Sequence, residues 1–262
     1  MSQRSIVLRP APSNGNGRRA FLGAVGAFGA AALVGRPLRA QDADSIEGIG
    51  CVDPSVYIDG FETPLSSCAL IPQETQGPYP LLSVLSNPAM VRRDITEGRP
   101  GVPLTMRLKL VDINANCAPI ADAGVYVWHC DKDGVYSGYQ QPGANTVGQT
   151  FCRGLQYTDC NGEVAFDTMY PGWYAGRITH VHFQVYLTTG GAVTATSQNA
   201  FPPAVTQAVY ASSLYAAHGQ NTSVASIAQD NVFSDGYALQ MPTVTGDTTT
   251  GYVARLAIGV AR

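Results

Sequence analysis

Regular alternation of hydrophobic and polar residues begins after Pro103. Leu104, Met106, Leu108 and Leu110 alternate with polar residues, a pattern typical of a β-strand with one buried face. The same alternation, or a short apolar run, predicts further strands over residues 125–128, 154–158, 164–168, 179–187, 192–197 and 252–260. The pattern therefore predicts a succession of short strands separated by turns.

One stretch carries helix signals instead. Residues 203–218 begin at a Pro-Pro pair and end before Gly219, which predicts a single helix. Residues 159–162 read Asp-Cys-Asn-Gly and predict a hairpin turn between the strands at 154–158 and 164–168. Because strands outnumber helices and no β-α-β rhythm occurs, we predict an all-β fold, an antiparallel β-sandwich.

The sandwich accounts for only part of the chain. Residues 103–262 carry the strand pattern and are predicted to form it. Residues 41–102 are rich in proline and show little alternation, but they contain cysteines and aromatic residues. We therefore predict that they form an irregular N-terminal arm that covers the core.

Residues 1–40 resemble a twin-arginine export signal. Arg18 and Arg19 precede an apolar run over Phe21–Gly35, and the first 40 residues contain no acid. The apolar run is short for a membrane span. We expect a periplasmic or extracellular protein with no stable membrane anchor after signal cleavage; the alternative is an uncleaved anchor helix.

Charge narrows the range of partners. Residues 1–40 hold six of the 16 basic residues, so the remainder has 16 − 6 = 10 basic and 19 acidic residues and a formal charge of −9. Such a chain is not expected to bind nucleic acid. The sequence leaves open whether the protein forms a homo-oligomer.

Six cysteines are scattered over residues 41–262, and none belongs to a Cys-x-x-Cys pair. In an exported chain this predicts three disulfides rather than a thiolate metal site. If the strands at 125–128 and 154–158 are antiparallel, their ends bring four of the cysteines together in two pairs, and the arm holds the third pair. The expected bridges are Cys130–Cys152, Cys117–Cys160 and Cys51–Cys68.

The first candidate for chemistry is a pair of histidines. His180 and His182 are two residues apart in a predicted strand, so both imidazoles face the same way. Such positions lie about 6–7 Å apart along the backbone. Two histidines so placed can share one metal ion if further ligands join them. The alternative is the solvated polar face of a half-buried strand.

Several motifs accompany this pair. They are a loop tyrosine after a strand-borne tryptophan (Trp128, Tyr136), a Pro-Gly-Trp-Tyr run ending at Tyr174, an Arg-x-x-His-x-His run starting at Arg177, and Glu-Thr-Gln-Gly-Pro-Tyr-Pro over residues 74–80. In this order they resemble the intradiol ring-cleavage dioxygenases, which are non-haem iron(III) enzymes. The resemblance is greatest to the exported branch of that family.

The resemblance implies that four residues bind Fe(3+): Tyr136, Tyr174, His180 and His182. A ferric ion is hard and favours anionic oxygen donors, which two tyrosinates supply. A bound ion also lowers the pKa of a phenol. The alternative for two histidines is iron(II) completed by a carboxylate, for which Asp167 and Glu163 are the candidates.

The resemblance also implies a reaction. O2 would cleave a catechol-type ring between its two hydroxylated carbons and give a cis,cis-muconic acid. The substrate would displace Tyr174 from the iron. Arg177 would stabilise charge on the ring, and Gln198 would contact the ring and the oxygen intermediate. Tyr79 and Trp128 would line the substrate site.

Each of these roles has a plainer alternative. Arg177 would only pair with an acid, Gln198 would be an ordinary strand-end amide, and the two aromatic residues would simply pack. His129 and His218 are not expected to be ligands. For the whole protein, the alternatives are a metal-free, transthyretin-like β-sandwich that binds aromatic ligands or partners, and a zinc or copper site on the same histidines. The identity of the catechol is not encoded in these motifs.

Overall fold

The computed structural model of the protein describes residues 68–188 and 190–262. The predicted export signal, Cys51 and the first part of the predicted arm lie outside the described residues.

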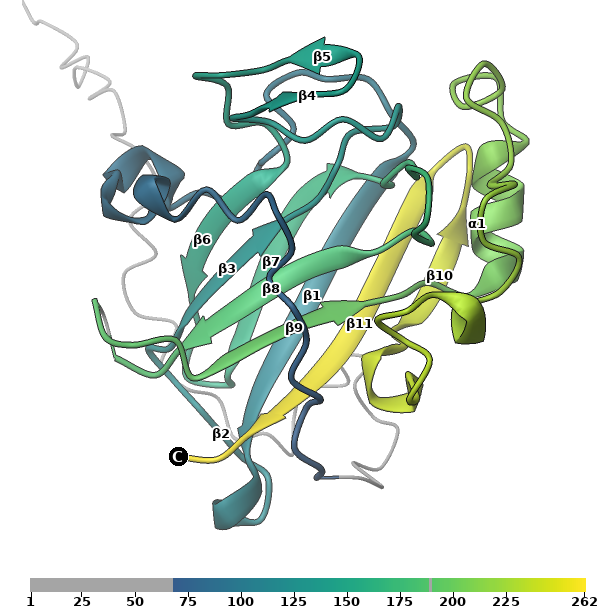
Figure 1. Ribbon diagram of the computed structural model, residues 1–262. Helices are drawn as coiled ribbons and strands as arrows, with labels where there is room; N and C mark the ends of the chain where they lie inside the picture. The colour runs from purple at the N-terminus through teal and green to yellow at the C-terminus, as the bar shows by residue number, and fades with distance from the viewer. Residues whose placement is uncertain (1–67, 189) are drawn as a thin grey trace, which may run out of the picture. The chain divides into compact units, whose positions relative to one another are not determined.

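Two β-sheets packed face to face form the body of the described chain (Figure 1). Sheet A contains β10 (Thr243–Asp247), β11 (Gly251–Val260), β1 (Pro103–Asp112), β2 (Ala118–Pro119) and β7 (Glu163–Met169). Sheet B contains, in spatial order, β6 (Arg153–Tyr157), β3 (Gly124–Trp128), β8 (Val181–Tyr186) and β9 (Ala195–Asn199). The predicted all-β sandwich is therefore confirmed.

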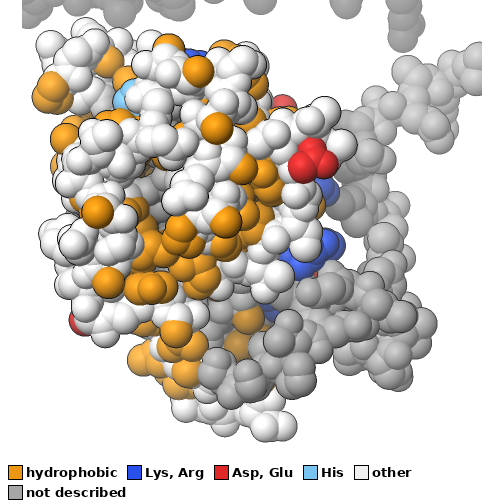
Figure 2. All heavy atoms as spheres, turned by 90° about the vertical axis from the view of Figure 1, so that its right-hand side faces the viewer, with side chains coloured by type: hydrophobic (Ala, Val, Ile, Leu, Met, Phe, Trp, Pro, Cys, Tyr) orange, Lys and Arg blue, Asp and Glu red, His pale blue; other side chains and the backbone are white. Residues whose placement is uncertain are grey.

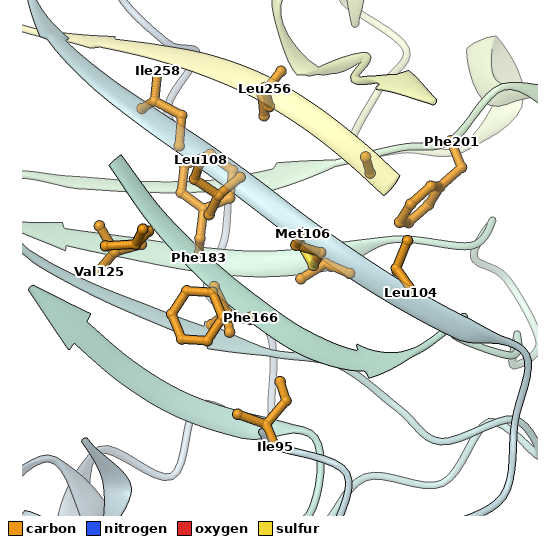
Figure 3. Packing of buried hydrophobic residues seen from close by; sticks show 14 of the residues in the cluster. Ile95, Leu104, Met106, Leu108, Val125, Phe166, Phe183, Phe201, Leu256 and Ile258 are labelled. Atoms are coloured by element: carbon orange, nitrogen blue, oxygen red, sulfur yellow. The ribbon is translucent and has the colours of Figure 1, made fainter. Parts of the chain in front are cut away.

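Alternating side chains from the two sheets form the core. Leu104, Met106 and Leu108 of β1 share one core cluster with Val125 of β3 and Phe183 of β8, and all five are at most 1% exposed (Figure 3). Each such side chain contributes about 1.5–3 kcal/mol by its burial. The inner faces of both sheets are consequently apolar, and polar side chains of β8 are directed to the outer face of sheet B.

Strand directions agree with the prediction except at the centre of sheet A. There β1 pairs in parallel with β11, with Leu104 opposite Tyr252 and Asp112 opposite Val260. The other pairings between named strands of the described chain are antiparallel. Two elements without a clear sequence pattern complete the strand set, namely the small hairpin of β4 (Gln140–Gln141) and β5 (Ala144–Asn145).

The predicted hairpin at residues 159–162 is wrong. The turn is present, but it joins β6 of sheet B to β7 of sheet A and so connects the two layers. Gly162 has φ +75°, and a Cβ on it would lie 2.5 Å from the Leu110 carbonyl oxygen, so the turn packs against β1. The Asn-Gly pair predicts a tight turn, but it does not determine which strands the turn connects.

The predicted helix at 203–218 is too long. Helix α1 spans Pro203–Tyr210, and the chain continues in turns. The Ser212 hydroxyl donates to the Val209 carbonyl at 2.6 Å and so competes with the helical hydrogen bonds. The described residues also contain short 3-10 helices at η2 (Leu82–Ser86), η3 (Pro88–Met90), η4 (Ile113–Ala115), η5 (Ile227–Gln229) and η6 (Ala238–Gln240). No helix in the described ranges is long and apolar enough to cross a membrane.

Residues 68–102, the described part of the arm, connect the two sheets. The Ile71 amide donates to Gly259 of β11 in sheet A, and the Glu74 amide donates to Thr196 of β9 in sheet B. The segment then crosses the outer face of sheet B (dark blue in Figure 1), where the Arg92 amide donates to Leu155 of β6. The arm thereby satisfies backbone groups at both edges of sheet B.

Two of the expected disulfides are wrong because Cys68 bonds to Cys117, with their Cα atoms 5.6 Å apart. This excludes both Cys51–Cys68 and Cys117–Cys160. The start of the arm lies against the end of β1, where the Cys68 sulfur is 3.9 Å from the Asp112 carbonyl oxygen. Cys160 is disulfide-bonded, so its partner is not Cys117.

The expected Cys130–Cys152 bridge is also wrong, since both cysteines are buried and free. Strands β3 and β6 are antiparallel, as expected, but Trp128 lies opposite Arg153. This register places Cys152 opposite His129, and the His129 amide donates to the Cys152 carbonyl. Cys130 is therefore one residue out of register with Cys152, and Cys152 has a positive φ of 55°, so the strand pairing does not place the two thiols opposite each other.

Candidate metal centre

Four side chains meet at one point on the outer face of sheet B. The Tyr136 hydroxyl, the Tyr174 hydroxyl and His182 Nε2 each lie 3.2 Å from His180 Nε2. Donor atoms that share one ion at metal–ligand distances of about 2 Å lie about 3 Å from one another. The four predicted ligands therefore converge with the spacing that a single metal ion needs.

The local sequence explains this convergence. His182 lies in β8 between Val181 and Phe183, which are buried in the core, so its imidazole is directed outward. Tyr136 follows β3 in a loop, and Tyr174 lies in the connection between β7 and β8. The end of β3 lies beside the start of β8, so the loops that carry Tyr136 and Tyr174 lie at the same end of sheet B as the two histidines.

The outer face of β8 is buried rather than solvated. His180 and His182 are each 2% exposed, and the arm lies directly against His182. A Cβ on Gly77 would lie only 3.2 Å from His182 Cε1, and Gly77 has φ +65°, a conformation that glycine adopts readily. The glycine of the Glu-Thr-Gln-Gly-Pro-Tyr-Pro motif thus allows the arm to pass directly over a candidate ligand.

Neighbouring groups orient both imidazoles. The Ile178 carbonyl can only accept, so His180 Nδ1 donates to it at 2.6 Å and leaves the lone pair on Nε2, which faces the site. The His182 ring stacks on Trp128, with centroids 4.9 Å apart and planes inclined by 6°. His182 Nδ1 is buried without a hydrogen-bond partner, so stacking rather than a hydrogen bond holds this ring.

Burial keeps the four groups neutral in the absence of an ion. Desolvation, assisted by the Arg177 charge, lowers the pKa of His180 well below its ordinary value, and desolvation lowers that of His182 likewise. Desolvation raises the pKa of Tyr136 well above its ordinary value and also raises the pKa of Tyr174. Neutral imidazoles are ready to bind a metal, whereas the phenols need a nearby cation to ionise.

Arg177 and Gln198 lie beside this cluster, as predicted from the motifs. Arg177 Nη1 is 3.3 Å from His180 Nε2, and Nη2 donates to Gln198 Oε1 at 2.6 Å. The Gln198 amide in turn donates to the Thr75 carbonyl of the arm at 2.8 Å. Both polar side chains therefore face the site and are held in place from two sides.

Sequence reasoning missed the acid that holds Arg177. Asp230 is 0% exposed, and its Oδ2 accepts from Arg177 Nε and from the Ile178 amide, both at 2.8 Å. The plainer alternative for Arg177, a pair with an acid, is thus true together with its place in the site. Asp230 lies in a loop with no hydrophobic period, so nothing in the local sequence distinguishes it.

A second buried arginine, also missed, connects the arm to the Tyr136 loop. Arg153 is 0% exposed and donates to the Ser137 hydroxyl at 2.7 Å, to the Ser137 carbonyl at 2.7 Å and to the Tyr79 carbonyl at 2.6 Å. The Tyr79 ring stacks on Tyr136 with centroids 4.8 Å apart. Tyr79 therefore packs on the candidate ligand Tyr136. Trp128, which is 0% exposed, packs on the candidate ligand His182.

The other candidates lie outside the cluster. Asp167 and Glu163 are on β7 of sheet A, where they pair with Arg93 and with Lys109. His129 contacts the Cys130 carbonyl and the Thr168 hydroxyl, and His218 contacts the Trp173 carbonyl. Among the described residues, no group of three or more His, Cys, Asp and Glu side chains could hold a metal. In the part of the chain that the structure describes, the phenol oxygens of Tyr136 and Tyr174 are the donors that lie beside these histidines.

Two phenols, two imidazoles and an arginine thus meet at one end of sheet B. A family model described as "Dioxygenase" (Dioxygenase_C) matches residues 76–216. The chain belongs to this family, the intradiol ring-cleavage dioxygenases. The family resemblance drawn from the sequence motifs is thereby confirmed.

Solved structures agree with this assignment. The intradiol ring-cleavage dioxygenase from Tetranychus urticae is 28% identical over 74% of this chain and 95% of its own, with a TM-score of 0.64. A second dioxygenase crystal structure is 28% identical with the same coverage and a TM-score of 0.61. No curated protein is significantly similar in sequence.

Proposed function

We propose that this chain is an iron(III) dioxygenase that uses O2 to cleave a catechol-type ring between its two hydroxylated carbons and releases a cis,cis-muconate-type product. One observation carries the proposal. Two phenol oxygens and two imidazole nitrogens meet with 3.2 Å between His180 Nε2 and each of the other three atoms, beside an arginine. This donor set suits a hard cation that favours anionic oxygen.

Tyr136, Tyr174, His180 and His182 would hold the ion. Bound iron(III) would lower the pKa of both phenols and of the catechol and would activate the ring toward O2. The imidazoles are already neutral and oriented, so they would bind without losing a proton. The two phenols would lose theirs, which leaves the four-ligand site with a formal charge of 3 − 2 = +1 before an anionic substrate binds.

Burial divides the tyrosines into two roles. Tyr136 is 1% exposed and is fixed between the Tyr79 ring and the loop bound by Arg153. Tyr174 is only partly buried and precedes the exposed residues Ala175 and Gly176. We infer that Tyr136 stays in place, whereas Tyr174 swings outward when the catechol binds and its Oη takes up a substrate proton.

Arg177 and Gln198 would act on the ring. The Arg177 guanidinium is anchored by Asp230 through Nε, which leaves Nη1 directed at the cluster. A cation so fixed stabilises negative charge on the bound ring without reorganisation. Gln198 would orient the ring edge through an amide that Thr75 already positions. The arm, which supplies Thr75 and Gly77, would exclude water from the site.

We also propose that the protein acts outside the cytoplasm. Arg18 and Arg19 before the apolar run at Phe21–Gly35 support a twin-arginine export signal. The Cys68–Cys117 disulfide suits an oxidising compartment. Fusing residues 1–40 to a reporter that works only after folded export would test this, with Arg18→Lys and Arg19→Lys together as the control expected to block export.

Colour and oxygen uptake together test the activity. The purified protein should contain one iron, absorb visible light through tyrosinate–iron charge transfer, and consume O2 with one equivalent of ring-cleaved acid across a panel of catechols. Metal-stripped protein reloaded with zinc is the control and should be colourless and inactive. A native protein that is colourless and merely binds catechols would instead support the metal-free sandwich, and coloured protein that cleaves no catechol would refute the proposed reaction.

A further inference from the structure

A cavity of about 400 Å³ lies apart from the metal centre, next to helix α1. Its walls come from α1, from residues 220–227, from Phe201 and Tyr237, and from the 178–179 segment. The four candidate ligands do not line it, and neither does Arg177 or Gln198. The face of the molecule that carries α1 is shown in Figure 2, where hydrophobic side chains gather in the middle.

The lining defines which ligands the cavity accepts. None of its lining residues is charged. Three aromatic rings line it, from Phe201, Tyr210 and Tyr237, together with aliphatic side chains such as Ile178 and Ile227. Aromatic walls favour stacking with a ring, and the absence of charge penalises an ionised ligand, whose desolvation no partner would offset.

Uncharged polar groups complete the lining. Thr206, Gln207, Gln220, Asn221 and Ser226 also line the cavity. The Gln220 and Asn221 amides each donate one hydrogen bond to a backbone carbonyl, of Gln207 and Arg177 respectively. Amide and hydroxyl groups of this kind give hydrogen bonds to phenol or ether oxygens without requiring a charge. A cavity of about 150 Å³ holds benzene, so the volume here admits a substituted ring or two rings.

We propose that this cavity is a second ligand site, distinct from the metal centre, for an uncharged phenol or aryl ether. The proposal goes beyond ring cleavage and does not depend on iron. The cavity would bind neutral, substrate-like molecules in preference to the dicarboxylate that ring cleavage would release, because its lining offers no positive charge to pair with a dianion.

One residue links the cavity to the centre. Ile178 lines the cavity, its carbonyl accepts from His180 Nδ1 at 2.6 Å, and its amide donates to Asp230 Oδ2 at 2.8 Å. The neighbouring Thr179 hydroxyl hydrogen-bonds to the Tyr210 hydroxyl in the same wall. An occupant would therefore contact the segment that orients both His180 and the acid that anchors Arg177.

The test uses a neutral probe and its charged counterpart. The probe 1,2-dimethoxybenzene is a neutral ring with two ether oxygens and no acidic proton, and 3,4-dimethoxybenzoate adds one carboxylate. Binding to the full, purified protein is measured by isothermal titration calorimetry with the centre saturated by 4-nitrocatechol. We expect one site for the neutral probe and affinity at least about tenfold weaker for the anion. Equal affinities, or no binding of the neutral probe, would overturn the proposal.

Two matched pairs of variants locate the binding. Ala225→Trp fills the cavity from one wall, and Ala228→Trp places the same side chain at an exposed position outside the lining. Gln207→Trp and Ala208→Trp form the equivalent pair on α1. The cavity-filling member of each pair should weaken binding of the probe at least about tenfold, while its control leaves the affinity unchanged.

The second pair covers the case in which one filled variant does not fold, which circular dichroism would reveal. Folded cavity-filling variants that bind the probe like the wild type would place it elsewhere and refute the site. Because turnover is not measured, this outcome is independent of the ring-cleavage proposal. If the protein lacks iron, the titration is run without 4-nitrocatechol and its interpretation is the same.

Discussion

At the residue scale, His182 offers the sharpest test of the metal centre because β8 supplies its own control. His182→Ala removes one of four protein donors, and we expect iron affinity to fall more than about 100-fold, since even outer-sphere partners of metal ligands are worth 10–100-fold. Gln184 is also 2% exposed and lies two residues further on the same face, but it contacts Thr196 and Tyr186 instead. Gln184→Ala should therefore keep iron and colour, as measured by metal analysis and visible absorbance. Full colour in His182→Ala would remove this histidine from the ligand set.

Arg177 is expected to act on the bound ring and not on the metal. Arg177→Met should retain iron but lower kcat by about 100-fold or more, the loss typical of one preorganised charge-stabilising donor. Arg93→Met is the matched control, because Arg93 also pairs with a carboxylate, that of Asp167 on sheet A, but its side chain is 63% exposed. Steady-state kinetics on iron-normalised protein measure both. Unchanged turnover in Arg177→Met would reduce this arginine to a structural partner of Asp230.

His129 predicts a specific pH dependence of stability. Burial lowers its pKa from 6.5 to about 4, and its Nδ1 donates to the Cys130 carbonyl at 2.7 Å. Below about pH 6.5 the unfolded chain binds a proton that the folded chain refuses until about pH 4, so the free energy of unfolding falls as the pH falls through this window. The full contribution is about 3 kcal/mol.

Urea unfolding of the wild type and of His129→Gln at pH 7.5 and pH 4.5 isolates this effect, because all other titrating groups are common to both. The variant should be less stable than the wild type at pH 7.5, and the gap should narrow by about 2–3 kcal/mol at pH 4.5. A gap that does not change with pH would show that His129 is not the titrating group.

At the element scale, the arm is predicted to shape the centre through Gly77. Gly77→Ala places a Cβ 3.2 Å from His182 Cε1, at a positive φ that costs about 1–2 kcal/mol for a residue with a side chain. Gly143 also has a positive φ, but nothing lies within 4 Å of the position that an added methyl group would take, so Gly143→Ala carries the same backbone penalty without the contact. Both variants should lose similar stability, and only Gly77→Ala should shift the visible band and raise KM. Identical spectra would show that the arm does not press on His182.

The strands could be predicted from sequence because their periodicity is local. Most residues of β1 and β11 alternate between buried and partly exposed positions, as their sequence pattern predicts. The apolar residues of β8 alternate with polar ones in the same way. The arm has no such period, since its conformation depends on hydrogen bonds to strands far along the chain. For the same reason, the sequence predicted polar residues on β8 but not that they would be buried.

The metal centre divides along the same line. The four candidate ligands lie in motifs with fixed spacing, so the sequence could propose them. Asp230 and Arg153 act through side-chain contacts with distant segments, and no motif points to them. The disulfide predictions were wrong for a third reason, which is strand register. The sequence predicted that β3 and β6 are antiparallel, but not their register, and a shift of one residue leaves Cys130 out of register with Cys152.

At the scale of the whole molecule, the Cys68–Cys117 bridge closes a loop of 49 residues that contains the described arm and β1. Chain-entropy arguments assign such a crosslink about 4 kcal/mol. Replacing both cysteines by serine should lower the free energy of unfolding by up to this amount, as measured by urea denaturation. Either single replacement should have the same effect as the double, because one cysteine cannot form the bridge. A loss below about 1 kcal/mol would show that the arm is held by its hydrogen bonds and packing alone.

The parallel pairing of β1 with β11 constrains when sheet A can fold during synthesis of the chain. β11 lies between β10 and β1, so sheet A lacks a central member until residue 260 has left the ribosome. Contacts between such distant segments form slowly, and one edge of β1 stays without its hydrogen-bonding partner during translation. All four candidate ligands are synthesised earlier, when sheet A still lacks β10 and β11 and the core between the two sheets is incomplete. Iron binding is therefore expected to follow completion of a strand that contributes no ligand, and a nascent chain stalled before β11 should bind no iron.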